Sequence, residues 1–126
     1  MMSKKIEIVG LEIVGDLWGN DEKKINNLSK RKIQTLISLL IKSVGFLELG
    51  SYYHQFGNGG ITGVVALAES HIAFHIWPEY RYVSLNVFIC NYSKDNSNKA
   101  RELFNKISTL FGPSSVTRKE ITRKLQ

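Results

Sequence analysis

The chain has 126 residues, 43% of them apolar and 22% charged, and these proportions predict one globular domain over residues 1–126. The single cysteine excludes an intrachain disulfide, no apolar run approaches the ~20 residues that cross a bilayer, and residues 1–7 lack a signal-peptide core, so we expect a cytoplasmic protein. The formal net charge of +6 comes from dispersed basic residues, which favours a solvated surface over nucleic-acid binding.

The first part of the chain predicts a strand, a helix and a second strand. Residues 6–17 are rich in Ile, Val and Leu and partly alternate with polar residues, which indicates a strand. Apolar residues then recur at helical spacing over residues 33–44, where Ser29 can cap the start and Gly45 can end the helix. Residues 46–56 return to a strand pattern.

The rest of the chain predicts further strands and a second amphipathic helix. In chain order these are strands at residues 61–68, 72–77 and 82–90, a polar loop at 91–98, a helix at 100–111 and a short strand at 116–121. Adjacent strands with two helices predict an α+β fold, a two-layer sandwich with one antiparallel sheet and two helices on one face. The other sheet face needs cover, so we expect a dimer with a four-layer αββα arrangement.

The last two strands before the polar loop each have one apolar and one mixed face. Side chains alternate along a strand, so His71, His75 and Trp77 share a face and the apolar residues between them share the opposite face. In the same way Asn86 and Cys90 share a mixed face of the next strand. The apolar faces are expected to pack on the helices, and the mixed faces suit a pocket or an interface.

One stretch of this region carries a family resemblance. The chain resembles the bacterial and archaeal S-adenosylmethionine decarboxylase proenzymes, which are pyruvoyl-dependent, most strongly over residues 60–90 and more weakly over nearly the whole length. The matching segments are Gly60-Ile61-Thr62-Gly63, Glu69-Ser70-His71, His75 with Trp77-Pro78-Glu79, and Val87-Phe88-Ile89-Cys90, with a weaker match at Tyr53-His54-Gln55-Phe56.

The resemblance implies that the chain cuts itself between Glu69 and Ser70, giving chains 1–69 and 70–126. Ser70 would attack the Glu69 carbonyl, and elimination from the resulting ester would leave Ser70 as a covalent pyruvoyl group. His75 matches the base that assists processing, since an imidazole exchanges protons near neutral pH. Thr62 matches a processing hydroxyl, which can stabilise the oxyanion of the acyl shift.

The resemblance also implies a reaction and a set of site residues. The pyruvoyl group would form a Schiff base with S-adenosyl-L-methionine and take up electrons as CO2 leaves, yielding the aminopropyl donor for spermidine synthesis. Cys90 matches the proton donor, Phe56 and Trp77 match aromatic residues of the substrate pocket, and Glu79 is placed to bind polar groups of the substrate. A homodimer of cleaved protomers without metal is implied, and His54 and His71 have no assigned role.

Departures from the family pattern leave the substrate open. Asn86 stands where the family usually has Asp, and Arg81 and Asn91 replace usual glycines. The changes at Asn86 and Arg81 make the local charge more positive, although Ser70, His75 and Cys90 are kept. A pyruvoyl-dependent decarboxylase of another amino acid, such as ornithine or arginine, is the main alternative, and a regulatory paralogue that is not cleaved is another.

Overall fold

Six antiparallel strands form one sheet, and its order differs from the chain order. The computed structural model describes residues 8–92 and 94–125, so Ile6, where the first predicted strand began, lies outside the described residues. The sheet order is β2-β3-β4-β5-β1-β6, with every neighbouring pair antiparallel. The strands are β1 (Ile8–Trp18), β2 (Leu47–Gln55), β3 (Ile61–Ala68), β4 (Ser70–Trp77), β5 (Tyr82–Cys90) and β6 (Ser115–Lys124).

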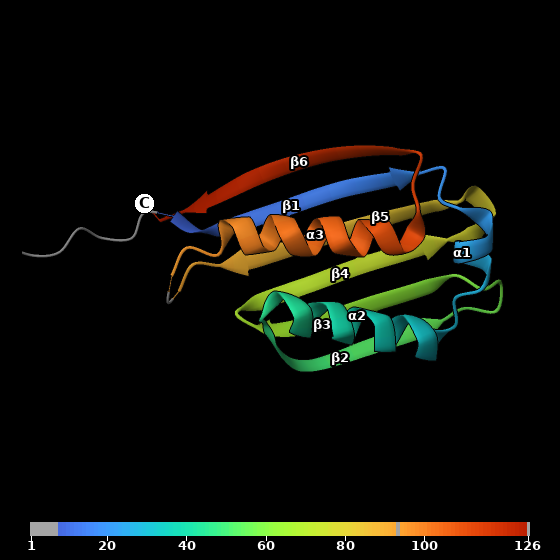
Figure 1. The fold of residues 1–126 in the computed structure, drawn as a ribbon, viewed down its shortest axis with the longest axis horizontal. Coiled ribbons are helices and arrows are strands. Elements are labelled where there is room, and N and C mark those ends of the chain that lie inside the picture. The colour runs from blue at the N-terminus through green and yellow to red at the C-terminus, as the bar shows by residue number, and fades with distance from the viewer. Residues whose placement is uncertain (1–7, 93, 126) are drawn as a thin grey trace, which may run out of the picture.

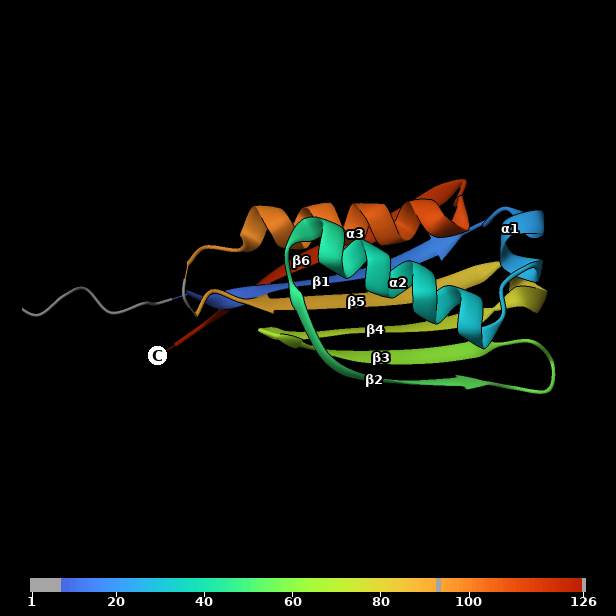
Figure 2. The ribbon, with the colours of Figure 1, turned by 60° about the horizontal axis from the view of Figure 1, so that its bottom comes forward.

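Both predicted helices are present and lie on the same face of the sheet. These are α2 (Lys30–Val44) and α3 (Ser97–Phe111), and Figure 2 shows both above the sheet. No helix of the described residues lies on the other face. Ser29 Oγ accepts the Lys32 N–H at 3.1 Å at the start of α2, and Gly45 ends it with a left-handed φ of 96°. The two-layer α+β prediction is therefore confirmed for the chain.

Four features of the fold differ from the sequence prediction. Strand β4 begins at Ser70 and not at residue 72, so Ser70 lies on the strand itself. Two short helices, α1 (Glu22–Asn26) and η1 (Pro78–Tyr80), were not predicted, because they are too short to show a periodic pattern. The last strand, β6, is longer than the predicted segment 116–121. Its side chains are mostly exposed, so the apolar alternation that marks a strand is weak there.

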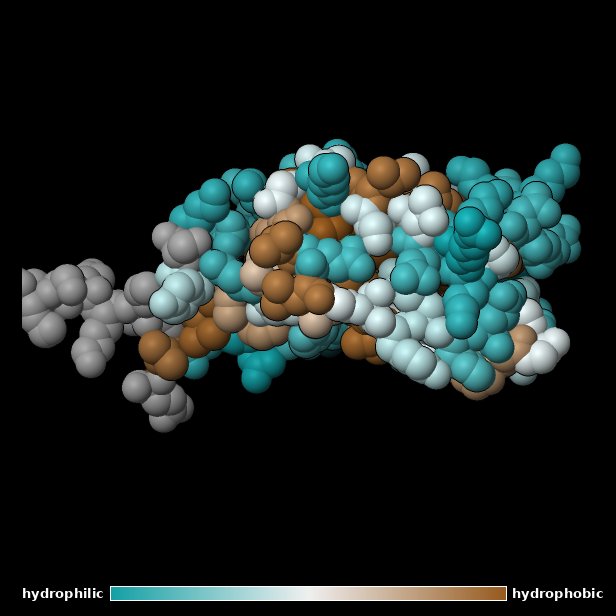
Figure 3. Space-filling view, turned by 90° about the horizontal axis from the view of Figure 1, so that it is seen from below, coloured by the Kyte–Doolittle hydropathy of each residue, from teal (hydrophilic) through white to brown (hydrophobic). Residues whose placement is uncertain are grey.

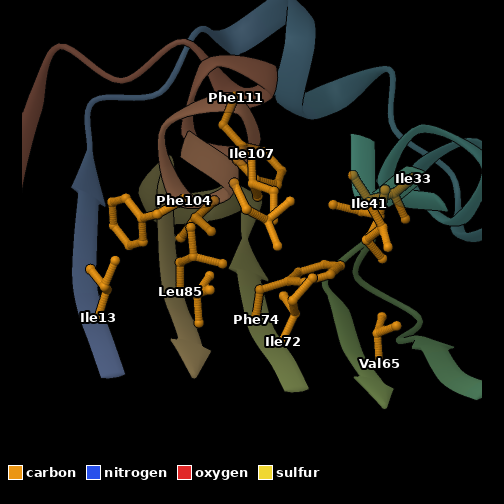
Figure 4. Packing of buried hydrophobic residues seen from close by; sticks show 14 of the residues in the cluster. Ile13, Ile33, Ile41, Val65, Ile72, Phe74, Leu85, Phe104, Ile107 and Phe111 are labelled. Atoms are coloured by element: carbon orange, nitrogen blue, oxygen red, sulfur yellow. The ribbon is translucent and has the colours of Figure 1, made fainter. Parts of the chain in front are cut away.

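The core lies between the helices and one face of the sheet (Figure 4). Phe74 of β4 is fully buried at its centre, with ring centroids 5.9 Å from Tyr53 of β2 and 6.3 Å from Phe111 of α3. Gly63 makes this packing possible, because a Cβ at that position would lie 2.5 Å from the Phe74 ring. Burial of each large apolar side chain contributes ~1.5–3 kcal/mol.

The connections between the strands gather at two opposite ends of the sheet. The β3–β4 turn and the start of α3 lie at one end, and η1 and the β2–β3 loop lie at the other (Figure 1). Seen from the β2 edge, apolar surface gathers nearer the first end and polar surface dominates the second (Figure 3). Both ends carry residues that the sequence marked as functional.

Candidate active site

The face of the sheet without helices carries the mixed side chains, as the alternation predicted. In β4 the residues Ile72, Phe74 and Ile76 are buried, and His75 and Trp77 between or beside them are exposed. In β5 the buried residues alternate in the same way with the half-buried Asn86 and Cys90. We call this surface the open face.

The Glu69–Ser70 peptide bond lies in the tight turn between β3 and β4. Ser70 has a φ of 112°, in a region that residues other than glycine rarely adopt. The Glu69 carbonyl oxygen accepts a hydrogen bond from the Cys90 backbone N–H at 3.3 Å. Ser70 pairs with Ile89 in the β4–β5 register, which is why Cys90 comes next to the turn. We call Glu69, Ser70 and Cys90 the junction.

Asn96, which the sequence did not mark, contacts the junction from the loop before α3. It is only 4% exposed, and its Nδ2 donates to the Cys90 carbonyl at 2.9 Å and to Glu69 Oε1 at 3.3 Å. In the sequence it is one more polar residue in a polar loop before a helix, so no local signal distinguishes it.

A second group of candidate residues gathers at the other end of β4. Thr62 and His75 are direct cross-strand partners, and Thr62 Oγ1 is hydrogen-bonded to His75 Nδ1 at 2.9 Å. They line a cavity of about 470 Å³ together with Phe56, Trp77 and Glu79. Phe56 is 51% exposed and Trp77 is 37% exposed, so two aromatic faces are available to a ligand. We call this the aromatic pocket.

Within one chain the two groups stay apart. His75 lies five residues after Ser70 on the same strand. At ~3.3 Å per residue this separates the two residues by ~16 Å, several times the reach of a hydrogen bond. The structure thus brings Glu69, Ser70 and Cys90 together, and it brings the five pocket residues together, but it does not join the two sets in one protomer.

A second hollow of about 420 Å³ on the open face is lined by residues that include His75, Asn86 and Asp16. Asn86 Nδ2 donates to Glu12 Oε2 at 2.9 Å, and Asn86 Oδ1 accepts from His71 Nε2 at 3.2 Å. The hydrogen bond from Asn86 is the main reason that the pKa of Glu12 is lowered. Glu12 also accepts from Arg123 at 2.8 Å, so its carboxylate lies between Asn86 and an arginine of β6.

Arg81, the second departure from the family pattern, contacts the backbone of Asn20 and does not line a cavity described above. Its Nε donates to the Asn20 carbonyl at 2.8 Å, and its own carbonyl accepts from Asn20 Nδ2 at 2.8 Å. Asn20 is fully buried, so this pair fastens η1 to the end of β1.

Residues 8–92 and 94–125 contain no group of three or more His, Cys, Asp or Glu side chains placed to hold a metal ion. No helix in this part of the chain is long and apolar enough to span a membrane.

Comparison with known proteins gives consistent results across sequence and structure. A family model described as S-adenosylmethionine decarboxylase matches residues 11–124. An S-adenosylmethionine decarboxylase proenzyme of Thermoplasma volcanium is 36% identical over 115 residues, which cover 91% of this chain and 84% of the relative. A proenzyme of the same name from Aquifex aeolicus is 35% identical over 108 residues, covering 86% of this chain and 76% of the relative.

The fold is similar to a solved structure as well. The crystal structure of the adenosylmethionine decarboxylase from Aquifex aeolicus matches with a TM-score of 0.82 and 32% sequence identity. The match covers 95% of this chain and 94% of the solved chain.

Proposed function

The chain belongs to the S-adenosylmethionine decarboxylase family, and we propose that it decarboxylates S-adenosyl-L-methionine with a pyruvoyl group that it makes from Ser70. The product would be the aminopropyl donor for spermidine synthesis. The observation that carries the proposal is the junction, where a strained serine follows a carbonyl that already accepts a backbone N–H.

Self-cleavage proceeds through atoms that the junction holds. Ser70 Oγ attacks the Glu69 carbonyl carbon, the C–N bond breaks, and the hydroxyl proton passes to the freed amine. Removal of the Ser70 Cα proton then breaks the Cβ–O bond, which releases Glu69 as a carboxylate and leaves dehydroalanine at position 70. Its imine tautomer takes up water and loses ammonia, leaving the pyruvoyl group at the new N-terminus of chain 70–126.

Two features of the junction favour the first step. Negative charge develops on the Glu69 carbonyl oxygen during attack, and the Cys90 N–H already points at that oxygen. A non-glycine residue at a φ of 112° is strained, at a typical cost of ~1–3 kcal/mol, and breaking the peptide bond releases the constraint on Ser70. The residues present therefore fit the group that the family implies.

Substrate binding is assigned to the aromatic pocket and proton return to the junction. Phe56 and Trp77 offer faces on which an adenine ring can stack, and Glu79, which accepts from Asn58 Nδ2 at 3.3 Å, offers a carboxylate to polar groups of the substrate. The pyruvoyl group would supply a ketone for the substrate amine and would take up the electron pair that remains on the substrate carbon when CO2 leaves. The Cys90 thiol then donates a proton to the carbon that has lost CO2.

The distance between the two groups leads us to include a second protomer in the site. The open face needs cover, and a two-fold axis between two such faces, running across the strands, exchanges the two ends of the sheet. In this arrangement His75 and Thr62 of the partner subunit lie at the junction. The His75 of the same chain remains ~16 Å away from its own Ser70. We propose an αββα homodimer with two such composite sites.

Intact mass and CO2 release test the proposal together. We expect the purified protein to consist of chains 1–69 and 70–126, the second blocked at its N-terminus, and to release CO2 from S-adenosyl-L-methionine in the presence of chelators. The matched control is Ser70→Ala, which should stay one chain and release no CO2. Release of CO2 from ornithine or arginine, with none from S-adenosyl-L-methionine, would assign that amino acid as the substrate. An intact, unblocked wild-type chain would refute self-cleavage.

A further inference from the structure

Asn96 makes a set of contacts that serve the junction rather than its own helix. It is the residue before α3, where an Asn side chain commonly accepts a backbone N–H of the first turn, but it makes no such capping bond. The N–H of Ser97, the first residue of α3, donates to Asp95 Oδ1 at 2.9 Å. The side chain of Asn96 is directed at Cys90 and Glu69.

The orientation of this side chain is set by its two partners. Both the Cys90 carbonyl and the Glu69 carboxylate accept hydrogen bonds, so only the amide NH2 can face them. Asn96 Oδ1 is left buried without a hydrogen-bond partner among the described residues. The two acceptors therefore hold the NH2 group of Asn96 toward the junction.

The contacts of Asn96 lock the strand end that carries the Cys90 N–H. Asn91 Oδ1 accepts the Asn96 N–H at 2.9 Å, and the Asn91 N–H donates to the Val9 carbonyl of β1 at 2.7 Å. Residues 90 and 91 are thus fixed on both sides, and the Glu69 side chain is tied to the same amide. The Glu69 carbonyl oxygen has little freedom to leave the Cys90 N–H.

From this arrangement we propose that Asn96 is a positioning residue for self-cleavage, which rests on the proposed function. It holds the Glu69 carbonyl against the Cys90 N–H and so favours attack by Ser70 Oγ. Its effect falls on the first step, formation of the ester, because that is where negative charge develops on the carbonyl oxygen.

The experiment compares three variants made as precursors and followed by intact mass after rapid purification. Asn96→Asp is nearly isosteric but turns acceptors toward acceptors, and we expect chain cleavage to slow at least about tenfold, the loss typical for a hydrogen bond to a charged group. Asn96→Ala, which removes the donor without adding charge, is expected to slow cleavage in the same direction. The matched control Asn98→Asp makes the same change at an exposed position in the first turn of α3 and should cleave at the wild-type rate.

Hydroxylamine identifies which step fails, and the unfolding midpoint separates a positioning role from a general structural one. It cleaves an ester but not a peptide bond, so the accumulated Asn96→Asp precursor should resist it, with an unfolding midpoint close to that of the wild type. A precursor cut by hydroxylamine would place the defect after ester formation and overturn the assignment. So would wild-type rates in both Asn96 variants. A wild-type chain that stays intact would instead overturn the proposed function, and the role of Asn96 with it.

Discussion

The composite site predicts that two inactive variants restore each other. His75→Ala lacks the proposed processing base and Ser70→Ala lacks the proposed nucleophile, so we expect neither to cleave alone. If Ser70 is served by His75 of the partner subunit, a mixed dimer contains one site with both groups and one site with neither. Ser70 and His75 of one chain are ~16 Å apart, so cleavage cannot be restored within a single chain and requires the partner subunit.

The magnitude follows from random pairing. Equal co-expression places about half of the His75→Ala chains in mixed dimers, so up to about half of them should be cleaved, and the Ser70→Ala chains should stay intact. Tags of different mass allow both chains to be counted by mass spectrometry. Mixing the two proteins after each has formed stable dimers is the control and should restore less. No cleavage of the His75→Ala chain in proven mixed dimers would refute the composite site.

Three further predictions concern binding and stability. Trp77→Ala should raise the KM for S-adenosyl-L-methionine about tenfold, measured by CO2 release, because base–aromatic stacking is lost. Trp18→Ala, outside the aromatic pocket, should leave the KM unchanged. Equal KM values for the two variants would contradict the assigned pocket. Phe74→Ala should lower the free energy of unfolding in urea by ~3–5 kcal/mol, and a loss below ~1 kcal/mol would contradict its central place in the core. Hydrogen bonds from Arg101 and then Arg118 lower the pKa of Glu120 to about 2, so its stabilising contribution is complete above its ordinary value of 4.5 and is lost as the pH falls towards 2. Glu120→Gln should remove that part of the acid sensitivity, ~1 kcal/mol or less for a surface pair, and identical acid unfolding of both proteins would contradict it.

Much of the fold followed from local patterns in the sequence. Apolar residues at every second position of residues 72–77 and 82–90 predicted both strands and their two faces, and burial in β4 and β5 follows that pattern. The helical spacing between Ser29 and Gly45 predicted α2 with its ends. These patterns are reliable because each depends only on which side of one element meets the core. Strand β6 was predicted too short and helix α1 was not predicted, because neither has a regular apolar side of sufficient length.

The sequence by itself determined which residues we propose to carry the chemistry, because the family resemblance rests on residue types and their spacing along the chain. The separation of Ser70 and His75 along one strand followed only from the structure, in which β4 begins at Ser70 and not at residue 72. Only the tertiary structure decided their neighbours. The β4–β5 register places Cys90 at the Glu69 carbonyl, and the β3–β4 register places Thr62 against His75. The loop before α3 brings Asn96 into contact with the junction. Such contacts join residues distant in the chain, and they depend on how strands pair and where a loop closes, which no local pattern records.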